Sequence, residues 1–348
     1  MAALLGIILH AIGGFAAGSF YAPYKKIKNW AWEIYWLLGG IFAWIIMPWL
    51  ISYMAIPNLN SFMSSLTMEE MFWPYFFGVL WGVGGLTFGL TMRYLGMSLG
   101  MAIALGLTAS FGTLIPPIYY GQFGDLLSSV SGWVTLFGII VSLIGITITG
   151  KAGIKKDNEL SVEQKQETIS EFNLKKGIWV ALFAGIMSAS FAFGIAAGKP
   201  ISVKAIEMGA TELFSNSPLF IIIMAGGFTT NLVWCLFLII KNKTIKDYVK
   251  TKDTPILKNY IFSAMGGIIW YFQFMFYGMG TTKMGDLDFA SWSIHMSFII
   301  IFSNMWGMIL KEWKGAGKST MRFLYIGLGI LILSTFIIGF GNYLQGFD

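Results

Sequence analysis

The sequence predicts an all-α polytopic membrane protein, with ten transmembrane helices arranged as two inverted five-helix repeats. Two observations predict the class. Of the 348 residues, 56% are hydrophobic and only 11% are Asp, Glu, Lys or Arg, less than half the charged share of an ordinary soluble domain. The charged residues also cluster between long charge-free runs. This composition excludes a soluble enzyme, a disordered chain and a disulfide scaffold, since the single cysteine, Cys235, has no partner in the chain.

Ten charge-free runs are long enough to cross the apolar core of a bilayer, which takes about 20 helical residues. Backbone groups in lipid must pair within their own segment, so we expect helices. The runs also lack the alternating polar residues of a barrel strand. In chain order, they span 1–24, 34–68, 71–92, 94–124, 126–150, 177–198, 213–240, 259–282, 289–310 and 323–347.

Local signals refine three of these elements. The first run has no basic residue before its apolar core, so we expect a permanent helix rather than a cleaved signal peptide. Pro48 lies well inside the second run and should kink that helix. Pro116 and Pro117 should end or break the fourth.

The basic residues predict the orientation. Loops after odd-numbered helices hold twenty of the twenty-three Lys and Arg residues, and the opposite loops hold only Lys199, Lys204 and Lys283. Because basic residues concentrate in cytoplasmic loops, we expect the odd loops in the cytoplasm and both termini in the periplasm of a bacterial inner membrane. The net charge of +6 then reflects membrane anchoring, and no nucleic-acid partner is expected.

Two halves of five helices each must run in opposite directions, an arrangement common in secondary transporters. Gly78 and Trp81 in the third run match Gly267 and Trp270 in the eighth, and an aromatic residue follows each Trp after seven positions. Chance is the alternative, because Gly and Trp are abundant. The expected units are a first repeat at 1–150, a charged cytoplasmic linker at 151–176 and a second repeat at 177–348.

Polar side chains inside the apolar runs indicate a binding site, since each costs energy in a bilayer unless it pairs or lines a wet cavity. The helical rise places such groups from four helices in one layer, about 10–15 Å from the periplasmic surface. There, Trp faces can stack on a sugar ring while polar groups bond its hydroxyls. A structural hydrogen bond is the alternative for each residue alone. The expected substrate-binding residues are His10, Trp81, Trp270, Gln273, Tyr277, Trp292 and His295.

Proton coupling requires a titratable group that faces each side of the membrane in turn. Asp288 is our first candidate, because it shares a helical face with Trp292 and His295 and lies near the periplasm. A solvated helix cap is the alternative for Asp288. His295 is the rival proton carrier, and His10 and Glu33 are further candidates.

The cytoplasmic ends of the helices suggest a gate. By topology, Glu33 lies near the cytoplasmic surface, where it could pair with Lys25, Lys26 or Arg93 as an inner gate. An ordinary surface ion pair is the alternative.

Long sequence blocks occur in order from the first helix to the last. They are FYAPYKK at 20–26 with W-x-W-E at 30–33, GLTMRYLGMS at 89–98, EFNLKKG at 171–177, WYFQFMFY at 270–277, SWSIHMSF at 291–298, and LKEW at 310–313 with AG at 316–317. These blocks resemble the L-rhamnose–proton symporters of the drug/metabolite transporter superfamily. The resemblance implies ten helices in two inverted halves, and uptake of a deoxy sugar with a proton. His10, Gln273, Asp288 and His295 match positions of the family pattern.

One stretch departs from the family pattern. Residues 84–87 are Gly-Gly-Leu-Thr, where the family carries asparagines. We therefore expect a pocket that is less polar on this side, which leaves the identity of the sugar open.

The expected function is proton-coupled import of L-rhamnose or a closely related deoxy sugar. A drug or metabolite exporter on the same scaffold is the alternative, and sodium in place of the proton stays open. The sequence contains no metal-ligand cluster, nucleophile motif or phosphate-binding loop. We therefore expect no catalytic residue, no metal and no cofactor, with H⁺ as the coupling ion.

Overall fold

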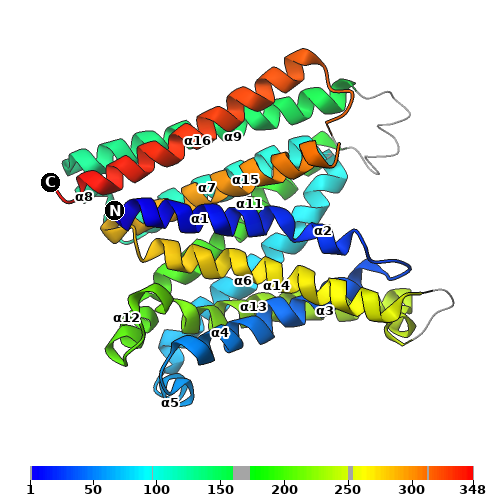
Figure 1. Cartoon of the computed structure of the whole chain (residues 1–348), viewed down its shortest axis with the longest axis horizontal. Helices are drawn as coiled ribbons and strands as arrows, with labels where there is room; N and C mark the ends of the chain where they lie inside the picture. Colours follow the sequence, from blue (N-terminus) through cyan, green and yellow to red (C-terminus); the bar gives the residue numbers. More distant parts are fainter. Residues whose placement is uncertain (1, 96, 160–172, 250–253, 312, 348) are drawn as a thin grey trace.

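A computed structural model describes residues 2–95, 97–159, 173–249, 254–311 and 313–347. These residues form helices and turns and no strand (Figure 1). Eight of the described helical stretches are long and apolar enough to cross a membrane. Large apolar side chains such as Ile144, Leu333 and Phe336 are exposed on the outside of the bundle, as on a surface that faces lipid. The expected class, an all-helical polytopic membrane protein, is confirmed.

The first half of the chain runs from α1 to α9. Two of its long helices are interrupted: α2 follows α1 directly, and α3 continues through the π-helical segment η1 into α4. The elements are α1 (Ala2–Ser19), α2 (Tyr21–Tyr24), α3 (Trp32–Gly40), η1 (Ile41–Ile46), α4 (Met47–Ala55), α5 (Leu59–Ser64), α6 (Met68–Leu95), α7 (Met97–Tyr119), α8 (Phe123–Ser128) and α9 (Val130–Glu159).

The second half runs from α11 to α16. Its elements are α11 (Leu174–Ala197), α12 (Lys199–Glu207), η2 (Glu212–Phe214), α13 (Ser217–Asn242), η3 (Thr244–Tyr248), α14 (Ile256–Thr281), η4 (Gly285–Ala290), α15 (Ser291–Ile309) and α16 (Lys318–Leu344). Within the predicted linker, 151–159 form the end of α9 and 174–176 begin α11. Residues 160–172 lie outside the described residues, and the division into repeats stays a prediction.

The prolines act on the helices in two ways. α7 ends at Tyr119, two residues after Pro117, as expected. Pro48 lies in α4, directly after η1, where the Met47 amide donates to the Phe42 carbonyl five residues back. Proline has no amide hydrogen to donate and crowds the preceding turn. The wider π turn therefore accommodates Pro48 by a change of hydrogen-bond pattern within a continuous helix.

The long helices pack as a bundle whose central members are α1, α6, α7, α11, α14 and α15. α9 and α16 lie side by side along one flank, and α3, η1 and α4 pack against α13 and α14 on the other (Figure 1). The two chain ends lie at the same end of the bundle. We call this the terminal end, where α1 begins and α16 finishes, and we call the opposite end, where α9 finishes and α16 begins, the basic end.

Candidate substrate site

Two buried histidines meet through a tyrosine in the terminal half of the bundle. The ring centroids of His10 on α1 and His295 on α15 are 6.0 Å apart, and Tyr277 of α14 lies 5.5 Å from the first ring and 5.1 Å from the second. The exposed fractions of His10 and His295 are 0% and 1%. None of their four ring nitrogens has a hydrogen-bond partner among the described residues. Buried polar groups are normally bonded, so these nitrogens can receive a polar ligand.

Trp292 of α15 forms the next contact. Its ring lies edge-on to Tyr277 with centroids 5.6 Å apart. Its indole N–H donates to the Thr108 carbonyl of α7 over 3.0 Å. Gly112 of α7 lies directly under the indole, where even one added Cβ would clash. The sequence analysis did not identify Gly112, because close packing between helices leaves no pattern within one helix.

Two further tryptophans extend this group of rings, which we call the aromatic cluster: His10, Trp81, Phe191, Trp270, Tyr277, Trp292 and His295. Trp81 of α6 stacks on Trp270 of α14 with centroids 5.6 Å apart and an interplanar angle of 25°. Phe191 of α11 connects this pair with Trp292, because its ring lies 5.0 Å from Trp81 and 5.6 Å from Trp292. Trp292 in turn contacts Tyr277, which lies against both histidines. The sequence analysis missed Phe191 as a site residue, since a phenylalanine in an apolar run gives no signal.

Gln273 is buried on α14, between Trp270 and Tyr277 in sequence. Its backbone carbonyl faces Gly13 of α1, and a Cβ at Gly13 would also touch the His295 ring. The structure therefore brings all seven predicted substrate-binding residues onto facing helices. They are His10, Trp81, Trp270, Gln273, Tyr277, Trp292 and His295.

The glycines in the departing stretch 84–87 have two environments. Gly84 packs against the backbone of Ser188 on α11, so a larger side chain would separate the two helices. Gly85 has no atom within 4 Å of an added Cβ. Only the second position thus has room for a polar side chain of the kind that the family pattern carries.

Asp288 lies at the terminal end, where its charge acts on the Tyr277 hydroxyl of the aromatic cluster. It belongs to the 3₁₀ segment η4, and α15 begins only at Ser291, so the helical spacing assumed between Asp288 and Trp292 does not apply. Its side chain is 39% exposed, and its carboxylate lies 3.2 Å from the Lys199 ammonium of α12. The other two lysines of this end also pair with carboxylates, Lys204 with Glu70 at 3.9 Å and Lys283 with Glu212 at 2.9 Å.

The proposed gate residues lie at the basic end. Glu33 is buried at the start of α3 and accepts hydrogen bonds from Asn242 of α13 and from Thr244, over 3.0 and 2.9 Å. Lys25 follows α2 and is exposed. Arg93 belongs to α6, but its side chain lies outside the described part of the chain. Among the described side chains, Glu33 therefore links α3 to α13 and η3 through neutral hydrogen-bond partners, and not through the basic residues expected from the sequence.

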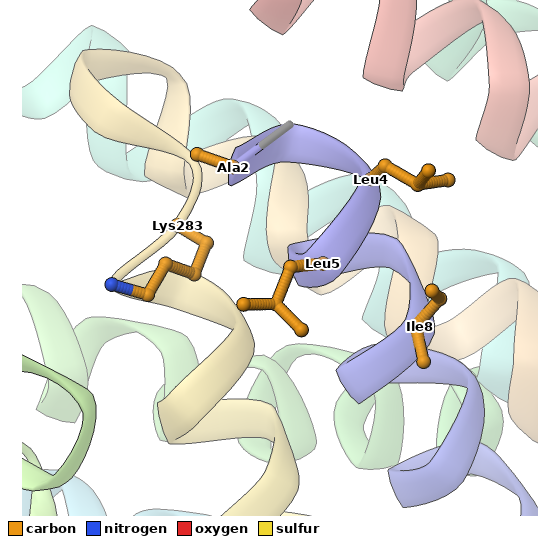
Figure 2. A pocket seen from close by; sticks show the side chains of 5 residues that line it. All are labelled: Ala2, Leu4, Leu5, Ile8 and Lys283. Atoms are coloured by element: carbon orange, nitrogen blue, oxygen red, sulfur yellow. The ribbon is translucent and has the colours of Figure 1, made fainter.

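A shallow hollow of about 400 Å³ lies beside the start of α1 (Figure 2). Leu4, Leu5 and Ile8 line it and are exposed. Its one charged group, the Lys283 ammonium, is paired with Glu212. A sugar requires hydrogen-bonding partners, so this apolar surface fits lipid chains, and the histidine cluster is the better sugar site.

Known proteins resemble the whole chain. The sequence profile described as "L-rhamnose-proton symport protein" matches residues 1–343. A protein of Mannheimia succiniciproducens named L-rhamnose-proton symporter is 40% identical over 341 residues, which cover 97% of this chain and 98% of the relative. Proteins of the same name from Yersinia pestis and Yersinia pseudotuberculosis are 39% identical over 343 residues, 98% of either chain. With full-length relatives at this identity and a matching profile, the chain belongs to the L-rhamnose-proton symport protein family.

Proposed function

We propose that this chain imports L-rhamnose, or a closely related deoxy sugar, together with a proton across the bacterial inner membrane by alternating access. The observation that carries the proposal is the full-length match to relatives named L-rhamnose-proton symporters. The chain is then a transporter rather than an enzyme, and H⁺ is its coupling ion. The same match disfavours the exporter alternative.

The sugar binds, in this proposal, between the two histidines and the tryptophans of the aromatic cluster. The four unpartnered imidazole nitrogens supply donors and acceptors for hydroxyl groups. Trp292, Trp81 and Trp270 supply faces for the apolar side of the ring. Gln273, one helical turn before Tyr277 on α14, supplies an amide in this proposal. In this structure the rings contact one another, so sugar entry requires the helices to part.

The proposed fold has ten transmembrane helices in two inverted halves, as in the drug/metabolite transporter superfamily. Its support lies in the packing. The ten proposed transmembrane helices are, in chain order, α1, α3 with α4, α6, α7, α9, α11, α13, α14, α15 and α16. Exchanging each helix for the one five places away turns the pair α6–α11 into α14–α1. The same exchange turns α6–α13 into α14–α3 and α7–α9 into α15–α16. Each of these pairs is in contact. A pseudo-two-fold relation between the halves would produce this pattern.

The repeated glycines and tryptophans support the same relation. Gly78 of α6 packs on the backbone of Ile223 in α13, and Gly267 of α14 packs on the backbone of Gly39 in α3. The two contacts are equivalent under the exchange of halves. Trp81 and Trp270, each three residues after its glycine, stack on one another. We infer that this stacked pair lies at the pseudo-axis.

The proposed proton carrier is Asp288, with His295 as the rival. A proton on Asp288 would remove the charge that Lys199 contacts. Protonation would thus release α12 from η4 at the terminal end, which we propose is periplasmic. At the other end, we propose that the bond network of Glu33 forms part of the inner gate.

Counterflow in liposomes tests the function. The purified protein is reconstituted into vesicles loaded with unlabelled L-rhamnose, and labelled L-rhamnose is added outside. Transient accumulation of label is expected, and a loading with D-glucose should give none. Efflux of a hydrophobic cationic dye, with no exchange of L-rhamnose, would instead identify an exporter and reject the proposal.

A further inference from the structure

The aromatic cluster continues beyond the candidate sugar site toward the basic end. Trp44 lies edge-on to Trp270 with centroids 5.3 Å apart, and Trp36 lies 6.0 Å from Trp44. Trp36 belongs to α3, one turn after that helix begins at Trp32. Ring-to-ring contacts therefore connect the histidines with the basic end of the bundle.

Trp44 has features that core packing does not require. It lies in the π-helical segment η1, and π turns occur frequently at functional sites. Its side chain is 4% exposed, yet its indole N–H has no hydrogen-bond partner among the described residues. Buried indole groups usually find an acceptor. A phenylalanine would keep an aromatic ring at this position without this cost.

An amide side chain lies on the same path. Asn231 of α13 is 5% exposed. Its carbonyl accepts a hydrogen bond from the Trp36 indole over 3.0 Å, and its amino group donates to the Gly227 carbonyl over 2.9 Å. The segment between Trp36 and Trp44 thus has ring faces, an unused donor and an amide. These groups can bind a pyranose through its apolar face and its hydroxyls.

We propose that Trp36, Trp44 and Asn231 form a second sugar subsite next to Trp270, on the path from the candidate site to the basic end. The inference rests on the proposed function. In this structure the rings close the path, because they contact one another. When the helices part at the basic end, the sugar leaves the histidines and stacks on Trp44 and Trp36, and its hydroxyls bind the Trp44 N–H and the Asn231 amide.

The decisive variant is Trp44→Phe, which keeps a ring and removes the donor. Its matched control is Trp30→Phe. The Trp30 indole N–H is also buried without a partner among the described residues, but the rings that Trp30 contacts are those of Tyr260 and Tyr248, which belong neither to the aromatic cluster nor to the proposed subsite. Two quantities are measured for each variant: equilibrium binding of L-rhamnose to purified protein, and the rate of counterflow in liposomes.

A subsite used only in transit changes the rate without changing the resting affinity. We expect Trp44→Phe to bind L-rhamnose within about twofold of the parent and to exchange it about tenfold more slowly, as for one lost hydrogen bond on the path. Trp30→Phe should match the parent in both measurements. Parental exchange by Trp44→Phe, or an equal loss of binding and exchange, would overturn the subsite.

A second variant keeps the proposal testable if Trp44→Phe fails to fold. Trp36→Phe with Asn231→Leu removes both partners of one hydrogen bond, which leaves neither of the two groups buried and unpaired. It should show the same slow exchange with near-parental binding, and normal exchange would contradict the subsite. If the parent itself exchanges no L-rhamnose, the proposed function fails. If the parent exchanges L-rhamnose and the variants exchange it at the same rate, the subsite is rejected and the proposed function stands.

Discussion

Trp292 contacts Tyr277, Phe191 and the α7 backbone, so its position fixes one wall of the candidate sugar site. That position depends on Gly112, which lies under the indole. A methyl group there would push Trp292 away from the Thr108 carbonyl. We expect Gly112→Ala to weaken L-rhamnose binding about tenfold, equivalent to about 1.4 kcal/mol, as measured by titration of the purified protein.

The control for this change is Gly106→Ala in the same helix. A Cβ at Gly106 would meet only Ile146, at an ordinary distance of 3.6 Å. Both substitutions should raise the helix propensity of α7 to the same degree. If the two variants bound L-rhamnose equally well, the position of Trp292 would not matter for the site.

At the residue scale, the sequence could predict the members of the site that carry a polar atom into an apolar run. His10, His295 and Gln273 are conspicuous because burial in lipid is costly for them, and the helical rise places them in one layer. It could not predict Phe191 or Trp44. Each looks like one of many aromatic residues in the chain, and only contacts between helices distinguish them.

Among the elements, α9 and α16 are joined at the basic end by Glu159. Its carboxylate accepts hydrogen bonds from the Gly317 amide over 2.7 Å and the Thr320 hydroxyl over 2.6 Å, at the start of α16. These bonds to the charged form hold the pKa of Glu159 below its ordinary value. A carboxylate at a helix N-terminus also complements the helix dipole.

The lowered pKa predicts a pH dependence of stability. Because the folded pKa of Glu159 lies below the unfolded one, its stabilisation is present above the ordinary Glu pKa of about 4.3 and is lost as pH falls through the folded value. Glu159→Gln should therefore melt at a lower temperature than the parent at pH 7, with a difference that shrinks below pH 4 or so. Thermal scans in detergent measure it.

The matched control is Glu207→Gln, which removes an exposed carboxylate at the end of α12. It should show no comparable pH-dependent difference from the parent. If the melting temperature of Glu159→Gln lay below that of the parent by the same amount at every pH, the loss of stability would come from the shape of the glutamine and not from the lost charge.

At the element scale, charge-free runs predict helices because uncharged segments of this length are what a bilayer accepts. They do not predict the ends. α9 continues to Glu159, beyond the run that stops at residue 150, and two lysines of this extension lie over the Phe323 and Trp313 rings. The predicted kink at Pro48 becomes a π segment, since the sequence shows the missing donor but not how the turn before it adapts.

For the whole molecule, the distribution of basic residues predicts which end lies in the cytoplasm. Single cysteines at exposed positions test it: Glu207→Cys at the terminal end and Lys246→Cys at the basic end, both with the buried Cys235 replaced by Ala. In intact cells, a membrane-impermeant maleimide should label the first and not the second. Labelling of Lys246→Cys alone would reverse the orientation and the assignment of the periplasmic side.

The last prediction concerns coupling, a property of the whole transport cycle. Asp288→Asn keeps the shape of the protonated acid, but it cannot release a proton and cannot pair as an ion with Lys199. Such a carrier can still exchange L-rhamnose across the membrane, because exchange needs no net proton movement. It cannot accumulate the sugar against its gradient, because no proton gradient drives the cycle.

Two liposome assays separate these outcomes, counterflow of L-rhamnose and its accumulation under an imposed pH gradient. Asp288→Asn should retain counterflow within a few-fold of the parent and lose accumulation. His295→Gln is the comparison, since His295 is the rival proton carrier. Accumulation that survives in Asp288→Asn and disappears in His295→Gln would move the proton to the histidine cluster. Because His295 lies within the candidate sugar site, the proton and the sugar would then bind at one site. Asp288 as the carrier would instead couple proton binding at its ion pair with Lys199 to sugar binding among the rings of the aromatic cluster.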